Sequence, residues 1–466
     1  MMKKSKNSAD NQPTMEEVNS SLSQIAGEEE PPMEPEAVQA SFAERINKIK
    51  LHRNKGDVIA KTIHNTYKVL TGTPGLEKLF GRNVLTGEIV TLHDYDTRLY
   101  GFGDVVIAKA TKIDELQIVK ISRVLNGIFV TDFGVDRIRQ AIEESADRRK
   151  FNPIKNYLDG VVWDRLPRLD SWLIDFAGAE DTKYVQAVAR KWMIQAVARA
   201  IRPGCHADSV LILEGKQGVG KNFLMESLLP DPDWAVSFNS SEINKDMVVS
   251  LEGKWFGEFC EMYTASRAEV KSLKAFISQR IDNYRKVYRR DHKAHPRLTV
   301  FWGGTNDDEY LLDETGNRRF LPIKVHGTVQ IDGLNDDQGN PKLFLDCGGL
   351  EAARDQLWAE AYQRFKDGEE YKLTTRESRE AELQTKERMI PDPWEGPVED
   401  YLRGGKTKIS TTSIPDVLQC AISLDIQKRT VADDRRVRKI LRKLGYEPVV
   451  GKENKKTVRQ WVRVAG

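Results

Sequence analysis

The spacing of apolar and polar positions changes along the chain and separates regions of different structure. Residues 57 to about 145 combine a helical stretch from Val58 to Leu70, a β pair joined by a turn around residues 83–90, and a helix near Val135 to Ile142. This mixture predicts a small α+β module.

The next two regions have different periods. From residue 151 to 203 the period is helical, and one face carries Tyr184, Val188, Trp192, Ala196 and Ala200. This face predicts a helical collar. Residues 205–325 then alternate apolar strands with helices, as a parallel sheet with crossover helices does.

The last part of the chain begins with a loop rich in Gly and Asp over residues 332–349. A long charged helix is predicted from Arg354 to Lys386, and three prolines at 391, 393 and 397 mark the boundary behind it. Two helices and a two-stranded ribbon follow, which predicts a winged helix.

Charge refines these boundaries at the N-terminus. Residues 1–36 contain three Lys against eight Asp or Glu and cannot bury enough apolar surface to fold alone. We therefore predict six regions: a disordered acidic tail (1–50), a small α+β domain (51–150), the helical collar (151–204), the α/β core (205–325), a loop and long-helix linker (326–395), and a basic winged-helix-like domain (396–466).

Composition narrows the class of protein. A chain of 466 residues exceeds one compact core, and no stretch approaches the roughly 18 uninterrupted apolar residues of a membrane helix. The basic start lacks a following apolar segment, and the four cysteines are far apart with no CxxC pair. We expect a cytoplasmic protein with reduced thiols, no zinc ribbon and no contact with a membrane.

The net charge of +2 conceals a basic C-terminus, because residues 400–466 contain sixteen Lys or Arg against seven acids. On the second helix of this region, Val437, Ile440, Leu441 and Leu444 are expected to pack inward. The cations left for phosphates are Arg435, Arg436, Arg438, Lys439, Arg442 and Lys443. A solvated helix face and a protein-binding winged helix are the alternatives.

A glycine-rich loop follows the apolar strand Val210–Leu213 in the arrangement GxxxxGK. The backbone N–H groups of such a loop can surround phosphates, and Lys221 can reach the β and γ oxygens. The predicted ATP-binding residues are Gly215, Lys216, Gln217, Gly218, Val219, Gly220, Lys221 and Asn222. Asn222 stands where Ser or Thr would offer a hydroxyl to Mg²⁺, so the metal must accept an amide or depend on water and Glu258.

Two carboxylates, Glu258 and Glu261, end an apolar strand about 40 residues after the loop. A nucleotide hydrolase of this kind needs one carboxylate for Mg²⁺ and one to polarise the attacking water. Because the two residues lie three apart, a bend near Cys260 is needed to bring both to the nucleotide. An edge strand with solvated acids is the alternative.

Other polar groups follow in the same region. Asn306 ends the apolar strand Leu298–Gly304, where an amide beside the phosphates can orient water, a role called sensor 1. Arg318 and Arg319 follow a glycine turn, and a guanidinium there can stabilise transition-state charge, also from a neighbouring subunit. Alone, each would be an ordinary turn residue.

These motifs together resemble the virulence-associated E family of phage and prophage P-loop ATPases, which are similar to superfamily 3 helicases. The resemblance spans residues 57 to 325 and rests on 151–158, 162–169, 202–205, the glycine loop, Glu258-x-x-Glu261, 304–306 and 316–320. It implies an AAA+-like ATPase core that assembles as a ring, expected to be a hexamer, and acts on DNA during replication of a mobile element.

The resemblance also implies a hairpin before sensor 1 that grips single-stranded DNA in the ring channel. Residues 271–297 are rich in cations and aromatic rings, which can contact the backbone and stack on bases. The predicted DNA contacts here are Tyr284, Arg285, Lys286, Arg289, Arg290, Lys293 and His295. Some of the arginines, Arg280 and Arg297 among the candidates, are alternatively expected at a subunit interface.

The sequence thus predicts an α/β P-loop NTPase core that drives a ring-forming, helicase-like motor with ATP and Mg²⁺ on single-stranded or forked DNA. Since no zinc-binding cluster or polymerising site accompanies it, a separate primase or replication protein is an expected partner in the bacterial host. Two alternatives stay open. One is a nucleotide-gated DNA-binding or origin-recognition adaptor that barely hydrolyses ATP, and the other is a host-interference or defence ATPase.

Overall fold

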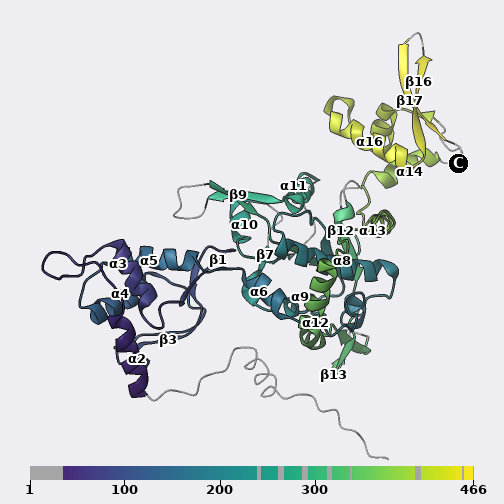
Figure 1. Ribbon diagram of the computed structural model, residues 1–466. Coiled ribbons are helices and arrows are strands. Elements are labelled where there is room, and N and C mark those ends of the chain that lie inside the picture. The colour runs from purple at the N-terminus through teal and green to yellow at the C-terminus, as the bar shows by residue number, and fades with distance from the viewer. Residues whose placement is uncertain are drawn as a thin grey trace, which may run out of the picture. The chain divides into compact units, whose positions relative to one another are not determined.

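The computed structural model describes residues 35–238, 243–260, 267–285, 292–311, 317–335, 338–404, 411–453 and 456–464 (Figure 1). The chain divides into two compact units, residues 1–160 and 161–466, here called the N-terminal and C-terminal units. None of the helices in the described ranges combines the length and apolarity that crossing a bilayer requires.

The N-terminal unit packs helices around small sheets. Its helices are α2 (Pro35–Asn47), α3 (Ile63–Gly72), α4 (Glu115–Phe129), α5 (Val135–Asp147) and α6 (Pro153–Gly160). Strand β1 (Phe80–Asn83) pairs antiparallel with β2 (Ile89–Thr91) and parallel with β5 (Lys150–Phe151), while β3 (Tyr95–Asp96) pairs with β4 (Val106–Ile107). Because β5 completes this sheet, the unit continues beyond residue 150.

Helix α2 lies in a segment that the sequence placed in a disordered tail. Phe42 is 3% exposed and contacts the rings of Tyr100 and Phe102, each at a centroid distance of 4.9 Å. This aromatic cluster supplies the apolar contact that orders residues 35–47. The acidic residues 1–34 lie outside the described ranges.

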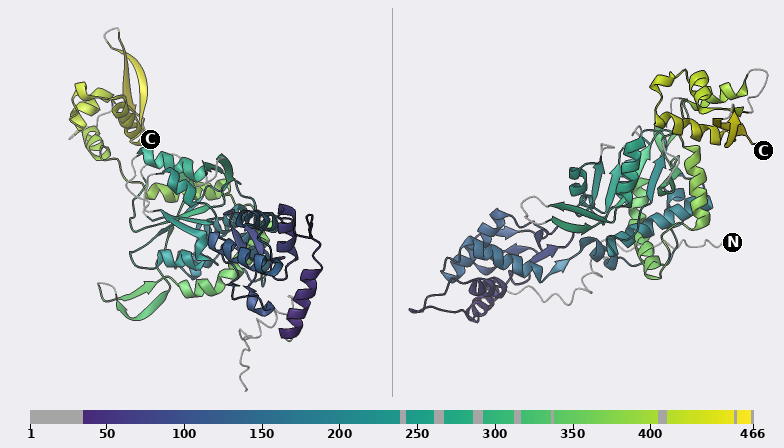
Figure 2. Two further views of the ribbon diagram at one scale, coloured as in Figure 1. Left: turned by 90° about the vertical axis from the view of Figure 1, so that its left-hand side faces the viewer. Right: turned by 90° about the horizontal axis from the view of Figure 1, so that it is seen from above.

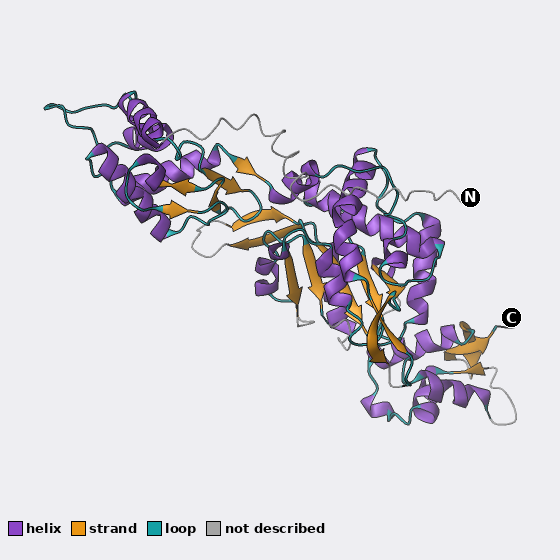
Figure 3. Ribbon diagram, turned by 90° about the horizontal axis from the view of Figure 1, so that it is seen from below, coloured by secondary structure: helices purple, strands orange, loops and turns teal. Residues whose placement is uncertain are grey.

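The C-terminal unit is built on a five-stranded parallel sheet with the order β12-β6-β11-β8-β7. The strands are β6 (Val210–Glu214), β7 (Ala235–Phe238), β8 (Phe256–Phe259), β11 (Val300–Thr305) and β12 (Phe320–Lys324). All five residues of β6 are buried, because helices cover both faces of the sheet (Figure 3). The predicted parallel sheet is therefore confirmed.

The two faces of the sheet are covered by different helices. On one face lie α8 (Lys183–Ile201), α9 (Lys221–Ser227) and α12 (Cys347–Lys366). The other face packs on α10 (Lys245–Ser250) and α11 (Arg267–Ser278) through Met247, Phe276 and Phe301. Helix α7 (Trp172–Asp175) packs on α8.

Two tryptophan ring N–H groups form hydrogen bonds between helix α8 and the sheet region. Trp192 of α8 donates to the carbonyl of Phe301 at 3.1 Å, and Trp255 donates to that of Ala196 at 2.9 Å. Trp192, Trp255 and their backbone partners are buried, so each indole N–H is satisfied inside the core. Helix α8 is accordingly buried on nearly all sides and covers the sheet.

The predicted long helix from Arg354 to Lys386 is instead two helices, α12 and α13 (Thr375–Glu387). Helix α12 ends just before Gly368, whose φ of +84° does not continue a helix, and the ammonium of the buried Lys191 donates to the carbonyls of Glu370 at 2.8 Å and Lys372 at 2.9 Å beyond it. A continuous helix would use those carbonyls internally.

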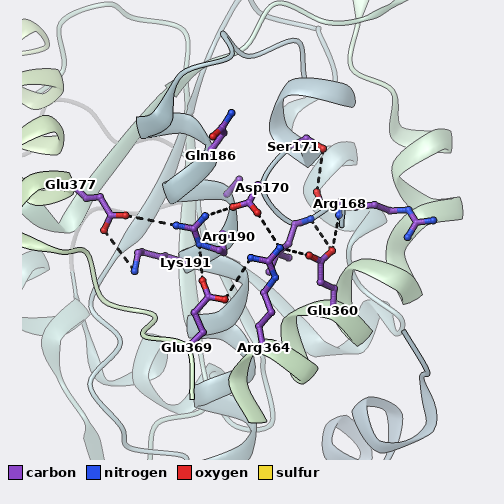
Figure 4. Close-up of polar contacts among 12 residues, drawn as sticks. Arg168, Asp170, Ser171, Gln186, Arg190, Lys191, Glu360, Arg364, Glu369 and Glu377 are labelled. Atoms are coloured by element: carbon purple, nitrogen blue, oxygen red, sulfur yellow. Dashed lines mark hydrogen bonds and ion pairs between the residues drawn. The ribbon is translucent and has the colours of Figure 1, made fainter. Parts of the chain in front are cut away.

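An ionic cluster holds these helices against α8 (Figure 4). Arg190 pairs with Asp170 and with Glu369 at 2.8 Å, and Arg364 bridges Asp170 at 3.0 Å to Glu360 at 2.5 Å. The fully buried Glu360 also accepts the backbone N–H of Arg168 at 2.7 Å. These contacts make α12 and α13 part of the α/β unit, where the sequence had placed a linker.

Two hairpins leave the sheet region. Strands β9 (Ile281–Arg285) and β10 (His292–Pro296) form one, and β13 (Val329–Asn335) and β14 (Pro341–Phe344) form the other. The second hairpin projects from the α/β elements in Figure 2 and overlaps the segment predicted as a Gly- and Asp-rich loop.

The end of the chain forms a small α+β assembly. It contains α14 (Glu395–Arg403), α15 (Ile414–Asp416) with a π-helical turn (Val417–Ala421), α16 (Val431–Lys443), and a sheet of β15 (Thr411–Thr412), β17 (Lys456–Arg463) and β16 (Tyr446–Glu453). Val437, Ile440 and Leu441 of α16 are buried, as the helical period predicted.

Candidate functional site at the carboxyl edge of the sheet

The order of the strands determines where a ligand can bind. The chain leaves β6 toward β7 at one edge of the sheet and leaves β11 in the opposite direction, toward β12. Crossovers between parallel strands are right-handed, so these two connections run over opposite faces. A crevice therefore opens at the carboxyl ends of β6 and β11, which is where open α/β sheets bind ligands.

A cavity of about 1040 Å³ lies at this crevice, slightly above the roughly 300–1,000 Å³ usual for small-molecule sites. It is lined by Gln217, Gly218, Val219, Gly220, Lys221, Asn222, Phe223, Glu226, Ser227, Leu229, Cys260, Gly304, Thr305, Asn306, Ile331, Phe344, Leu345, Cys347, Glu351 and Arg354. Six of the eight residues predicted to bind the nucleotide are in this set.

The loop between β6 and α9 needs its glycines. Gly218 and Gly220 have φ of +78° and +102°, a region that side-chain-bearing residues rarely adopt. A Cβ on Gly215 would come within 2.8 Å of the carbonyl oxygen of Val325. Glycine therefore lets the backbone turn tightly here.

Lys221 connects the loop to the end of β11. Its ammonium donates to the carbonyl of Gly215 at 2.7 Å, to that of Lys216 at 3.2 Å, and to the side-chain oxygen of Asn306 at 2.7 Å. The structure thus brings together two residues 85 positions apart that the sequence assigned to one site. Burial lowers the pKa of the Lys221 ammonium.

Glu258 is 6% exposed in β8 and accepts a hydrogen bond from the hydroxyl of Ser237 at 2.6 Å. Burial raises the pKa of its carboxyl group, and the nearby Glu226 carboxylate raises it further. A raised pKa makes the carboxylate form of Glu258 a stronger proton acceptor than that of an exposed glutamate. The chain bends at Cys260 directly after β8, and Glu261 lies outside the described residues.

The two residues predicted from sequence to bind Mg²⁺ differ in their exposure to solvent. Asn222 is exposed at the start of α9, whereas Glu258 is buried. Within the described ranges, no group of three or more His, Cys, Asp or Glu side chains converges on a point. Asn222 lines the cavity, whereas Glu258 is not among its lining residues.

The two arginines before β12 differ in their surroundings. Arg319 donates to the hydroxyl of Ser278 at 2.7 Å and lies 3.5 Å from a carboxylate oxygen of Asp208. Arg318 is exposed and has no ion pair with any other described residue. Arg318 is thus the more exposed of the two arginines.

The β9–β10 hairpin carries part of the predicted DNA contacts. The rings of Tyr284 and His295 stack at a centroid distance of 4.1 Å with an interplanar angle of 15°. Arg285 and Lys293 belong to the two strands, and Lys286, Arg289 and Arg290 lie outside the described residues.

Arg297 and Arg280, two of the arginines for which a subunit interface was the alternative, make contacts within the subunit. The side chain of Arg297 is fully buried, pairs with Asp282 at 2.9 Å, and lies over the ring of Phe276 at 4.3 Å. Arg280 donates to the carbonyl of Gly204 at 2.7 Å. Both arginines fasten the base of the hairpin inside the subunit.

On α16, the predicted cations are divided between two roles. Arg436 pairs with Asp392 at 2.5 Å and lies 4.0 Å from the ring centre of Trp394, so it fastens the helix to the preceding segment. Arg435 is exposed, and Arg438 and Lys439 are half-buried, with Arg438 3.7 Å from Asp434.

The sequence did not identify the wall of the cavity formed by Ile331, Phe344, Leu345 and Cys347. These residues belong to or follow the β13–β14 hairpin. The alternation in Pro341-Lys342-Leu343-Phe344 was the available signal, because alternating residues point to opposite faces of a strand.

Comparison with known proteins identifies the family of this chain. The family model described as the virulence-associated protein E-like domain matches residues 158–390, and the chain therefore belongs to this family. No curated protein matches the chain.

Solved structures of the NrS-1 C-terminal region are similar at low identity. The apo structure of region 305–718 has a TM-score of 0.46 at 13% identity and covers 86% of this chain and 98% of that one. An A-form apo structure of this region has a TM-score of 0.45 at 12% identity, covering 86% and 99%.

Proposed function

We propose that this protein is a P-loop, AAA+-like ATPase that works as a ring-forming, helicase-like motor on single-stranded or forked DNA. The observation that carries the proposal is the contact of Lys221 with Asn306 across the loop and the end of β11. A lysine in a glycine-rich loop and an amide on the neighbouring strand are what nucleotide hydrolysis needs at one point.

The residues fit ATP with Mg²⁺. Lys221 already holds three oxygen acceptors, and phosphate oxygens can replace them without new desolvation of the ammonium. The glycine loop borders a cavity large enough for a nucleotide. When bound, Mg²⁺ would neutralise phosphate charge, with Glu258 and Asn222 as its nearest protein candidates.

The side chains have distinct roles in this proposal. Glu258, whose pKa is raised by burial, accepts the proton of the attacking water. Asn306 orients that water, and Lys221 stabilises charge on the phosphates. The exposed Arg318 supplies a guanidinium to the site of a neighbouring subunit.

DNA binding is proposed at two places. The stacked Tyr284 and His295 can hold bases without reading sequence, with Arg285 and Lys293 on the same hairpin for the backbone. The second place is α16 in the basic winged-helix-like domain, through Arg435, Arg438 and Lys439. We propose a hexamer and a separate primase or replication protein as partners in replication of a phage or mobile element.

The test is the ATPase rate of the full chain with and without single-stranded DNA, together with strand displacement on a forked duplex. Stimulation by DNA and displacement of the strand are expected, and Lys221→Ala should abolish nucleotide binding. Normal ATPase activity in Lys221→Ala would contradict the site.

One observation favours a second candidate, a nucleotide-gated DNA-binding adaptor with little hydrolysis. Asn222 provides no hydroxyl for Mg²⁺. ATP-dependent assembly on duplex DNA without turnover would support this candidate, and a clear gain in turnover by Asn222→Thr would identify the cause.

A further inference from the structure

The β13–β14 hairpin is joined directly to the glycine-rich loop. The N–H of Leu345, just after β14, donates to the carbonyl of Val219 at 3.0 Å. On the other side, the N–H of Asp346 donates to the carbonyl of Phe176 at 2.8 Å. The end of β14 is thus held between the loop and the segment after α7.

The base of the hairpin is closely packed against neighbouring backbone. A Cβ on Gly327 would lie 2.8 Å from backbone atoms of Phe344, and a Cβ on Gly178 would lie 2.5 Å from the carbonyl oxygen of Gly327. Three stretches of backbone therefore pack closely, and the position of β14 relative to the loop is well defined.

Strand β14 turns one face toward the cavity. Lys342 and Phe344 are half-buried, whereas Pro341 and Leu343 are exposed, as the alternation of a strand requires. Phe344 lines the cavity together with Ile331 of β13. Lys342 therefore shares its face with a residue of the cavity wall.

The ammonium of Lys342 lies beside the loop. It is 3.8 Å from the position that a Cβ on Gly218 would occupy and 5.3 Å from the ring centre of Phe344. Among the described residues, no carboxylate pairs with Lys342. A half-buried cation held over an aromatic ring and directed at a glycine loop has a charge to share with a ligand.

We propose that Lys342 is a second phosphate-binding cation of the nucleotide site and makes the site selective for nucleoside polyphosphates. The inference rests on the proposed function, because it assigns the phosphates to the loop of Gly218. Lys221 approaches the loop from α9 and the β11 side, and Lys342 approaches it from the hairpin. A polyphosphate chain offers a separate anionic phosphate group to each of the two cations, whereas a monophosphate offers only one group.

Phe344 is a positioning residue in this arrangement. Its ring limits where the Lys342 side chain can go, so less conformational entropy is lost when the ammonium binds an anion.

The test is equilibrium binding of ATP and AMP to the full chain with Mg²⁺, for the unchanged protein, Lys342→Met and Lys342→Arg. Lys342→Met should weaken ATP binding about tenfold and leave AMP binding within about twofold, because one charge-assisted hydrogen bond is lost only with the polyphosphate. Lys342→Arg should retain most of the ATP affinity.

Lys324→Met is the matched control, since Lys324 is an exposed lysine at the end of β12 whose neighbour is Asp308. Its affinities should be unchanged. Unaltered ATP affinity in Lys342→Met, or equal losses for ATP and AMP, would overturn the role of Lys342. If the unchanged protein and Lys221→Ala bind ATP equally poorly, the proposed function fails as well, which separates the two failures.

Discussion

Burial shifts the pKa values of two side chains that are proposed to form the site. Lys221 and Glu258 are 9% and 6% exposed, and burial moves the pKa of each toward neutrality, downward for the ammonium and upward for the carboxyl group. Hydrogen bonds from Lys221 to Asn306 and from Ser237 to Glu258 offset part of the cost of holding these groups inside.

Glu258→Gln should remove the catalytic base while stabilising the fold at neutral pH. Because the folded pKa of Glu258 is raised, its contribution to stability is present at acid pH and is lost as pH rises through that folded pKa. Because glutamine does not ionise, the variant does not lose this stability as pH rises. We expect turnover to fall at least about 100-fold, and the melting temperature to rise relative to the unchanged protein between pH 5 and 8.

Ser227→Ala serves as a control, because Ser227 lines the cavity and its hydroxyl donates to the carbonyl of Phe223 at 2.9 Å. Glu258→Gln with turnover close to that of this control would show that Glu258 is not the base.

Glu214 gives a stability prediction at the residue scale. This carboxylate, directly before Gly215, is held by Arg388 at 2.6 and 2.8 Å and by the hydroxyl of Tyr310 at 2.8 Å, and all of these groups are largely buried. Arg388→Met would leave its charge unpaired. We expect a loss of about 3–5 kcal/mol in urea unfolding.

Arg403→Met is the comparison for this prediction, because Arg403 pairs with Glu399 on an exposed helix. Its change should stay within about 0.5 kcal/mol. A similar small change in Arg388→Met would mean that water relieves the Glu214 charge.

At the scale of elements, α16 has one arginine that is proposed to bind DNA and another that holds the helix against the preceding segment. Arg435 is exposed, whereas Arg436 is bound by Asp392 and Trp394. Arg435→Ala should therefore reduce the slope of log affinity for DNA against log salt by about 1, with unchanged stability. Arg436→Ala should lower the melting temperature and leave that slope nearly unchanged.

The measurement is DNA binding by the full chain over a salt series, with thermal unfolding of the same samples. If Arg436→Ala rather than Arg435→Ala reduced the salt slope, the helix would present its other face to DNA.

The elements also show how the site is assembled. The glycine loop is separated by 80 or more residues in sequence from the end of β11 and from the β13–β14 hairpin, but it is joined to them by the contacts of Lys221 with Asn306 and of Val219 with Leu345. Binding of phosphates at the loop would therefore stabilise the hairpin as well.

At the scale of the whole molecule, the exposed Arg318 predicts that turnover depends on assembly. Arg318→Ala should bind ATP normally but hydrolyse it at least about 1,000-fold more slowly, as a missing arginine finger does. Mixing Arg318→Ala with Lys221→Ala should restore activity, because the first supplies an intact loop and the second an intact arginine.

Absence of any recovery, with mixed assemblies confirmed by light scattering, would contradict action between subunits. Arg319→Ala is the comparison, and because Arg319 bonds Ser278 within its own subunit, its loss should not be rescued by mixing.

Local patterns in the sequence determined much of this protein. The glycine loop, the apolar strands that end at Glu258 and Asn306, and the helical period of α16 could be recognised because each depends on neighbours within a few residues. The same holds for the turn between β1 and β2.

Only the tertiary structure decided which of these residues meet. The contact between Lys221 and Asn306, the burial of Arg297, the contact of Lys191 with the segment between α12 and α13, and the approach of Lys342 to Gly218 all join positions far apart in the chain. Such contacts depend on strand order and on packing between layers, and a residue's own sequence neighbours do not contain that information.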